Sequence, residues 1–152
     1  MSFVFDQSTN PCFGRRDDLD GKVWLWAKAT TGATAKYPYM LYVEELAYVA
    51  TTPADNTEEY RVGVPAKAVT SGSFDWFQIG GPCANMVPAD TGTAASVSVT
   101  IGHGLYMKDG AVTTTGSDYA GMAVNAFAVA DETVNDDEIN VILVPDIILA
   151  TT

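Results

Sequence analysis

The segment at residues 62–82 restricts the fold of this 152-residue chain most, because runs that favour strands alternate in it with residues that break regular structure. Pro65 fixes its own φ and favours extended backbone in the residue before it. Ser71-Gly72 is typical of a turn, and residues 73–79 predict a strand that the sequence Gly-Gly-Pro at 80–82 is expected to end. The segment therefore predicts two strands joined by a corner, and it contains almost no reactive side chains.

The rest of the chain continues this β pattern. The sequence Lys108-Asp109-Gly110 predicts a hairpin, since Asp-Gly supplies the positive-φ positions that a tight turn needs. No long amphipathic stretch with helix caps occurs, so the fold class is expected to be all-β. Strands are predicted at residues 22–28, 39–43, 49–52, 60–64, 74–79, 96–101, 104–107, 111–114, 122–130 and 139–144, a helical turn or a strand at 44–48, and an acidic loop at 131–138.

The strand that begins at Lys22 is apolar on both faces. Val23 and Leu25 alternate along it with Trp24 and Trp26, so neither side carries the polar row of a solvated strand. We expect this strand in a sheet that is covered on both sides, or at an interface.

Charge disfavours two classes of partner. Nineteen acidic and eight basic residues give a formal net charge of −11, which repels phosphate backbones and anionic lipid surfaces. We therefore expect neither nucleic acid nor a membrane as partner, and acidity is most simply explained as a means of solubility. Residues 1–6 lack the features of a secretory signal, which predicts synthesis in a cytoplasm.

The two cysteines, Cys12 and Cys83, lie far apart in sequence and form no C-x-x-C pair. They could form one disulfide. Without a disulfide framework or a signal sequence, the expected role is that of small buried apolar residues.

Residues 1–21 mix aromatic, polar and charged side chains without a helix or strand period, which predicts an extended N-terminal arm before a single β-rich domain at 22–152. Phe3, Phe5 and Phe13 of this arm are costly to leave in water. They are expected to pack either on a neighbouring subunit or on the barrel of their own chain.

Catalytic and metal-binding motifs are not evident, and no cofactor is predicted. His103 is the single histidine and stands between two glycines, which is typical of a turn and not of a zinc cluster. The sequence Asp18-Leu19-Asp20-Gly21 resembles part of a calcium loop but lacks its first and last ligands. Acids within residues 131–138 form a solvated face or, less simply, bind a cation.

Aromatic side chains are the remaining candidates for a binding surface in the sequence. Trp76 is expected in the core. Tyr37 and Tyr39 flank a proline, and we predict them as exposed contacts for a sugar or another protein.

The order of these motifs resembles tailed-phage (podovirus-like) head decoration, or capsid cement, proteins. The resemblance rests on Val-Pro, the turn glycine, the tryptophan and Gln-Ile-Gly-Gly within 62–82, on the opening at 2–24 and on the final strand at 139–144. It implies a small β-barrel or a β-clip-like (β-tulip) domain on the outer capsid surface of a virion, with the major capsid protein as partner. It also implies a homo-oligomer, a trimer or dimer.

On this resemblance, the residues of the arm that would bind the capsid are Phe3, Phe5, Phe13, Arg15 and Arg16, and Val23, Trp24 and Trp26 would form the self-interface. The two arginines would pair with acidic groups. The protein would stabilise the capsid lattice without chemistry.

Two other classes stay open. A head-fibre or tail-associated module would bind receptor glycans through Tyr37 and Tyr39, although repeats and heptads are absent from the sequence. An enzyme would require Asp75, Asp118 and His103 to converge in one cleft.

Overall fold

The computed structural model describes residues 14–44, 47–51, 61–87, 97–99, 101–102, 104–108, 111–113, 123–129, 132–134 and 138–149. Every regular element in these ranges is a strand, which confirms the all-β prediction. The strands are β1 (Arg15–Asp17), β2 (Val23–Ala29), β3 (Tyr39–Glu44), β4 (Ala47–Thr51), β5 (Arg61–Pro65), β6 (Phe74–Met86), β7 (Val97–Val99), β8 (Gly104–Lys108), β9 (Ala111–Thr113), β10 (Ala123–Ala128), β11 (Glu132–Val134) and β12 (Ile139–Leu149).

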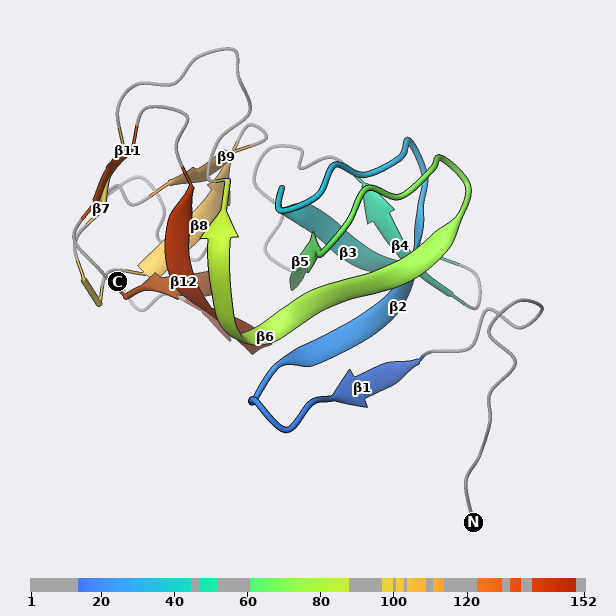
Figure 1. Ribbon diagram of the computed structural model, residues 1–152, viewed down its shortest axis with the longest axis horizontal. Coiled ribbons are helices and arrows are strands. Elements are labelled where there is room, and N and C mark those ends of the chain that lie inside the picture. Colours follow the sequence, from blue (N-terminus) through green and yellow to red (C-terminus); the bar gives the residue numbers. More distant parts are fainter. Residues whose placement is uncertain are drawn as a thin grey trace.

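Five strands close into a small barrel, as predicted (Figure 1). They pair in the order β2-β4-β3-β5-β6, and β6 pairs again with β2. The β2–β4 pair is parallel and the other pairs of the ring are antiparallel. Closure removes the free edges that these five strands would have in an open sheet.

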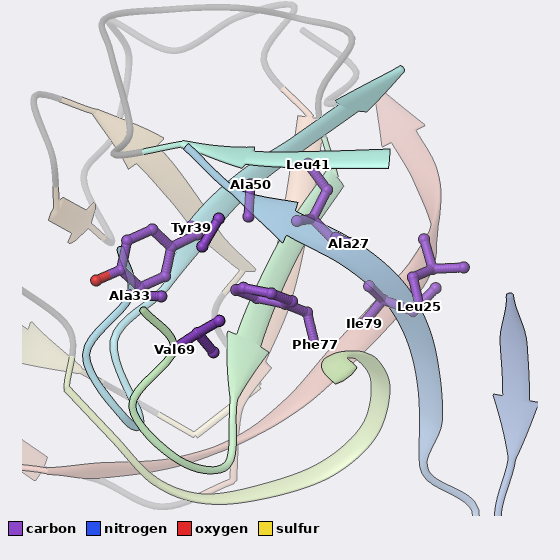
Figure 2. Packing of buried hydrophobic residues seen from close by; sticks show 10 residues of the cluster. Leu25, Ala27, Ala33, Tyr39, Leu41, Ala50, Val69, Phe77 and Ile79 are labelled. Atoms are coloured by element: carbon purple, nitrogen blue, oxygen red, sulfur yellow. The ribbon is translucent and has the colours of Figure 1, made fainter. Parts of the chain in front are cut away.

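The barrel core is built from the side chains that point to the inner face of each strand. Leu25, Leu41 and Phe77 alternate with outward-facing residues and are at most 2% exposed. Phe77 lies amid the cluster, which Tyr39, Ala33, Val69, Ala50, Ala27, Ala29 and Ile79 complete (Figure 2). Small alanines around one large ring let five strands close tightly.

Gly63 of β5 is required by this packing. A Cβ at this position would lie 2.9 Å from the Cβ of Phe77 and would also overlap the side chain of Leu41. Leu41 and Phe77 therefore fill the space that a side chain at position 63 would take.

Strand β6 does not end at residues 80–82, where the Gly-Gly-Pro sequence led us to expect its end. It bends there, with Gly81 at φ 80°, and continues to Met86. The buried Gln78 supports the bend, because its Nε2 donates to the carbonyl oxygens of Gly80 at 3.1 Å and Pro82 at 2.7 Å. The sequence expected to end the strand forms a bend within one long strand instead, because β12 supplies the backbone partners that keep the second half of β6 extended.

The second half of β6 belongs to a further sheet with the order β6-β12-β10-β8-β9 (Figure 1). Its β8–β9 pair confirms the hairpin predicted around Asp109-Gly110, since Lys108 pairs with Ala111. On one face of β6 and β12 the side chains are buried, namely those of Cys83, Met86, Ile139, Val141 and Leu143.

This sheet covers one outer wall of the barrel. Strand β12 contacts β5, and the outward-facing Met40, Val62 and Val64 are only 4–6% exposed. The backbone N–H of Val87 donates to the Lys36 carbonyl oxygen at 3.0 Å, and Lys36 Nζ lies 2.8 Å from Glu138 Oε1. The barrel wall at β3 and β5 is therefore not an open surface.

Two local predictions differ from the structure. Residues 132–134 form strand β11, paired with β7, where an acidic loop was expected. In the expected arm at 1–21, residues 15–17 form β1, which pairs with β2. Residues 18–22 form the turn between these two strands. In both places a charged segment is held extended by pairing with another strand, β2 for residues 15–17 and β7 for residues 132–134. Residues 1–13 lie outside the described residues.

Candidate functional site

A row of aromatic side chains lines the outer face of β2 and β6. These side chains alternate along the two strands with the residues that face the barrel core. Trp26 pairs with Trp76 across the two strands, and their ring centroids lie 5.1 Å apart at an interplanar angle of 62°. Trp26 also stacks on Phe74, with centroids 6.4 Å apart and planes within 13°. We call Trp24, Trp26, Phe74 and Trp76 the aromatic row. The ring faces of Trp26 and Phe74 are turned toward each other.

Arg16 of β1 closes one end of the aromatic row. Its guanidinium carbon lies 5.1 Å from the ring centroid of Trp24 and 5.0 Å from that of Trp76. Its Nε is 3.0 Å from Asp18 Oδ1, and Trp24 donates its indole N–H to Asp18 Oδ2 at 2.8 Å. The arginine thus has two aromatic partners and one carboxylate, and Trp24 is left only 8% exposed.

A lysine at position 16 should loosen this contact although it keeps the charge. A guanidinium is planar and stacks on rings, whereas an ammonium does not. We expect Arg16→Lys to lower the free energy of unfolding by about 1 kcal/mol and to change tryptophan fluorescence.

Arg15→Lys is the matched control for this substitution. Arg15 lies one residue away, and its ion-pair partner among the described residues is Asp17, at 3.0 Å, with 52% of the Arg15 side chain exposed. Its replacement should leave fluorescence and stability almost unchanged. Equal effects of the two substitutions would contradict a special role of the rings around Arg16.

The turn between β1 and β2 is held by its own polar groups. Asp18 N donates to Lys22 O at 2.8 Å and Gly21 N donates to Asp18 O at 3.1 Å. Lys22 Nζ lies 2.6 Å from Asp20 Oδ2. This side-chain hydrogen bond lowers the pKa of Asp20 and raises the pKa of Lys22, so both groups are charged over the neutral range.

The residues predicted to bind a capsid are only partly described. Phe3, Phe5 and Phe13 lie outside the described residues. Arg15 and Arg16, expected to meet acidic groups, pair within the chain with Asp17 and Asp18. Exposed ion pairs of this kind contribute little to the free energy of folding, so they do not prevent Arg15 and Arg16 from making a second contact with a partner.

The predicted self-interface residues lie on strand β2. Val23 is half-buried against the barrel core, Trp24 is covered by Arg16 and bonded to Asp18, and Trp26 lies within the aromatic row. The self-interface stays a prediction, in which the partly exposed part of the row would be the available surface.

Two predictions about aromatic residues are wrong. Tyr39 is a core residue at 8% exposure, where its ring meets Phe77 edge to face and its hydroxyl accepts a hydrogen bond from Thr34 N at 2.7 Å. Tyr37 is only partly buried against the same core, so its role as a contact stays a prediction. Trp76, expected in the core, faces outward in the aromatic row. Tyr39 and Trp76 are strand residues, and the side that a strand residue faces depends on the register of the barrel, which the local pattern does not contain.

Cys83 is a free, buried thiol on β6, in agreement with the role of a small apolar residue; Cys12 lies outside the described residues. Burial raises the pKa of Cys83 from 9.0 to about 11. The folded protein therefore holds this proton more tightly than the unfolded chain does. Stability from this group is present below pH 9 and is lost as the pH rises toward about 11.

We expect the Cys83 thiol to resist alkylation in the native protein at neutral pH and to react on unfolding. The experiment uses a Cys12→Ser background and counts the labelled thiols by mass spectrometry. In denaturant titrations, Cys83→Ala should show a smaller fall of stability from pH 9 to about 11 than the parent. Rapid native labelling would contradict the burial of the thiol.

The described residues do not test whether Asp75, Asp118 and His103 converge in one cleft, as an enzyme would require. Asp75 forms an ion pair with Lys67 at 3.0 Å, while His103 and Asp118 lie outside these residues. In the part of the chain that the structure describes, no three His, Cys, Asp or Glu side chains gather as a metal site would require. The same part contains no helix that could span a membrane.

The contact of Arg16 with two tryptophans was missed by reasoning from sequence. A signal was present, since Asp18-Leu19-Asp20-Gly21 is a turn that can fold residues 15–17 back on 23–25. A hairpin there would have placed Arg16 opposite Trp24, which is the observed register.

Comparison with known proteins rests on structure alone. No protein-family model and no curated protein matches the chain. A similar solved structure is the N base of the head fiber protein gp8.5 in bacteriophage phi29, with a TM-score of 0.51 and 16% sequence identity. The match covers 84% of this chain and 98% of that chain. At this identity the likeness shows a shared fold, and it extends over nearly all of the head fiber base.

Proposed function

We propose that this protein is a non-catalytic structural protein of a tailed-phage virion that attaches to the outer surface of the head. The observation that carries the proposal is the likeness of its fold to the N base of a phage head fiber, over 98% of that base. The aromatic row and the β1–β2 turn add surfaces suited to protein contacts, since tryptophan and arginine are enriched at interfaces.

Two more specific roles follow from different observations. The structural likeness favours the base of a head fibre. The sequence resemblance favours a cement protein, in which many copies on the major capsid protein stabilise the lattice. Both roles gain from a homo-oligomer, a trimer or dimer, because several weak contacts then act together.

Glycan binding by this part of the chain has less support. Sugars stack on exposed, flat ring faces, but Tyr39 is buried in the core. In the aromatic row the rings of Trp26 and Phe74 stack on each other, and Arg16 covers Trp24 and Trp76.

The test is to mix the purified protein with undecorated, expanded heads of its phage, pellet the heads and determine the bound copies by cryo-electron microscopy. Density at fixed positions on the head would support attachment. Copies across the whole lattice would favour the cement role, whereas isolated protruding copies would favour a fibre base. Absence of density from the head surface would overturn the proposal.

A further inference from the structure

Leu19 is the most exposed large apolar side chain of the described residues. Its relative exposure is 110%, compared with 61% for Ile101 and 55% for Val43. It stands in the turn between β1 and β2, flanked by Asp18 and Asp20. Single exposed leucines are ordinary on protein surfaces, so exposure alone does not make this one a contact.

The rigidity of the turn is the second observation. Two backbone hydrogen bonds close it, and Asp18 is held by both Arg16 and Trp24. At its base the carbonyl group of Gly21 lies so close to Gly81 that a Cβ on Gly81 would collide with it. A side chain displayed on an ordered turn loses little further freedom on binding, which favours its use as an anchor.

Charge around Leu19 is locally balanced although the chain carries −11. Each of the three acids of this hairpin is paired with one of its three bases, in the ion pairs Arg15–Asp17, Arg16–Asp18 and Lys22–Asp20. Asp20 still has 54% of its side chain exposed, so it can accept a hydrogen bond from a partner. The tip thus offers an apolar side chain beside acceptor oxygens, without an unpaired charge.

These features fit a protein pocket better than a lipid surface. One leucine cannot hold a folded chain on a bilayer, and the net negative charge opposes anionic lipids. An apolar pocket with hydrogen-bond donors at its rim matches both Leu19 and Asp20.

We infer that the β1–β2 turn at residues 18–22 is the docking tip of this protein, and that Leu19 inserts into an apolar, donor-rimmed pocket of a protein on the head surface. The inference rests on the proposed function and adds the surface that performs it. It differs from the expectation that the N-terminal phenylalanines make the main contact.

The test measures binding of the full chain to undecorated heads, with a Leu19→Ser variant, a Leu19→Met variant and Val43→Ser as control. Leu19 is fully exposed, so neither substitution there should alter folding, which thermal unfolding verifies. We expect Leu19→Ser to weaken binding about ten- to hundred-fold, the effect of losing one buried leucine, and Leu19→Met to change it only a few-fold. Val43→Ser should bind as the parent does, because Val43 lies outside the turn.

The outcomes separate this inference from the proposed function. If the parent protein binds and Leu19→Ser binds equally well, the docking tip is wrong while attachment to the head stands. If the parent protein does not bind, both are overturned. Specific loss in Leu19→Ser, with Val43→Ser unaffected, supports the docking tip.

Discussion

Phe77→Ala is expected to lower the free energy of unfolding by about 3–5 kcal/mol, because it removes the largest fully buried side chain among the described residues. Phe77 is 0% exposed. Its ring meets that of Tyr39 edge to face, and its Cβ lies close to Gly63. The neighbours include several alanines, which cannot move in to fill the cavity. Since small domains have about 5–15 kcal/mol of stability in total, the variant should unfold at a much lower denaturant concentration.

The matched control is Phe74→Ala, which changes the same residue type on the same strand. Phe74 faces outward and stacks on Trp26, so its loss should cost only about 1–2 kcal/mol. Urea titration followed by circular dichroism measures both variants. Equal losses would contradict the assignment of Phe77 to the centre of the core.

Gly81→Ala is expected to lower the free energy of unfolding by about 2–5 kcal/mol, through two additive causes. Gly81 has φ 80°, a conformation that costs a residue with a Cβ about 1–2 kcal/mol. The added Cβ would also collide with the backbone of Gly21 and lie 3.1 Å from Lys22 Cα, and backbone atoms cannot turn aside as a side chain can. The collision should displace the β1–β2 turn, with a change in the fluorescence of Trp24.

Gly72→Ala separates the two causes, because Gly72 has the same φ of 80° but nothing within 4 Å of an added Cβ. It should cost only about 1–2 kcal/mol and leave the fluorescence unchanged. If both variants lost the same stability, the close approach of Gly81 to Gly21 would not matter to the fold.

The strands were predictable where the signal is local. Residues 39–43 and 139–144 alternate or favour β structure, and Asp109-Gly110 has the backbone freedom of a tight turn, so β3, the start of β12 and the β8–β9 hairpin were expected. The end of β6 was predicted wrongly, since Gly-Gly-Pro permits both the end of a strand and a bend within one. Hydrogen bonding to β12, which is distant in sequence, decides for the bend.

The candidate site was predictable only in its composition. The sequence offered tryptophans on a two-faced strand and arginines before it, and the structure brings Arg16 between Trp24 and Trp76. Tyr39 and Trp76 exchanged their expected places, one into the core and one onto the outer face. A shift of one residue in strand register turns every side chain to the other face, and register depends on the neighbouring strands.

The amino-acid sequence by itself determined that this chain is all-β, which segments are extended and where its tight turns lie, because backbone preferences and two-residue periodicity act between near neighbours. Only the tertiary structure decided that five strands close on Phe77, that β6 passes from the barrel into a second sheet, and that Leu19 stands alone on an ordered turn. These features depend on pairing between β2 and β6 and between β6 and β12. Such contacts join residues tens of positions apart, and their stability comes from packing and hydrogen bonds that no local stretch of sequence contains.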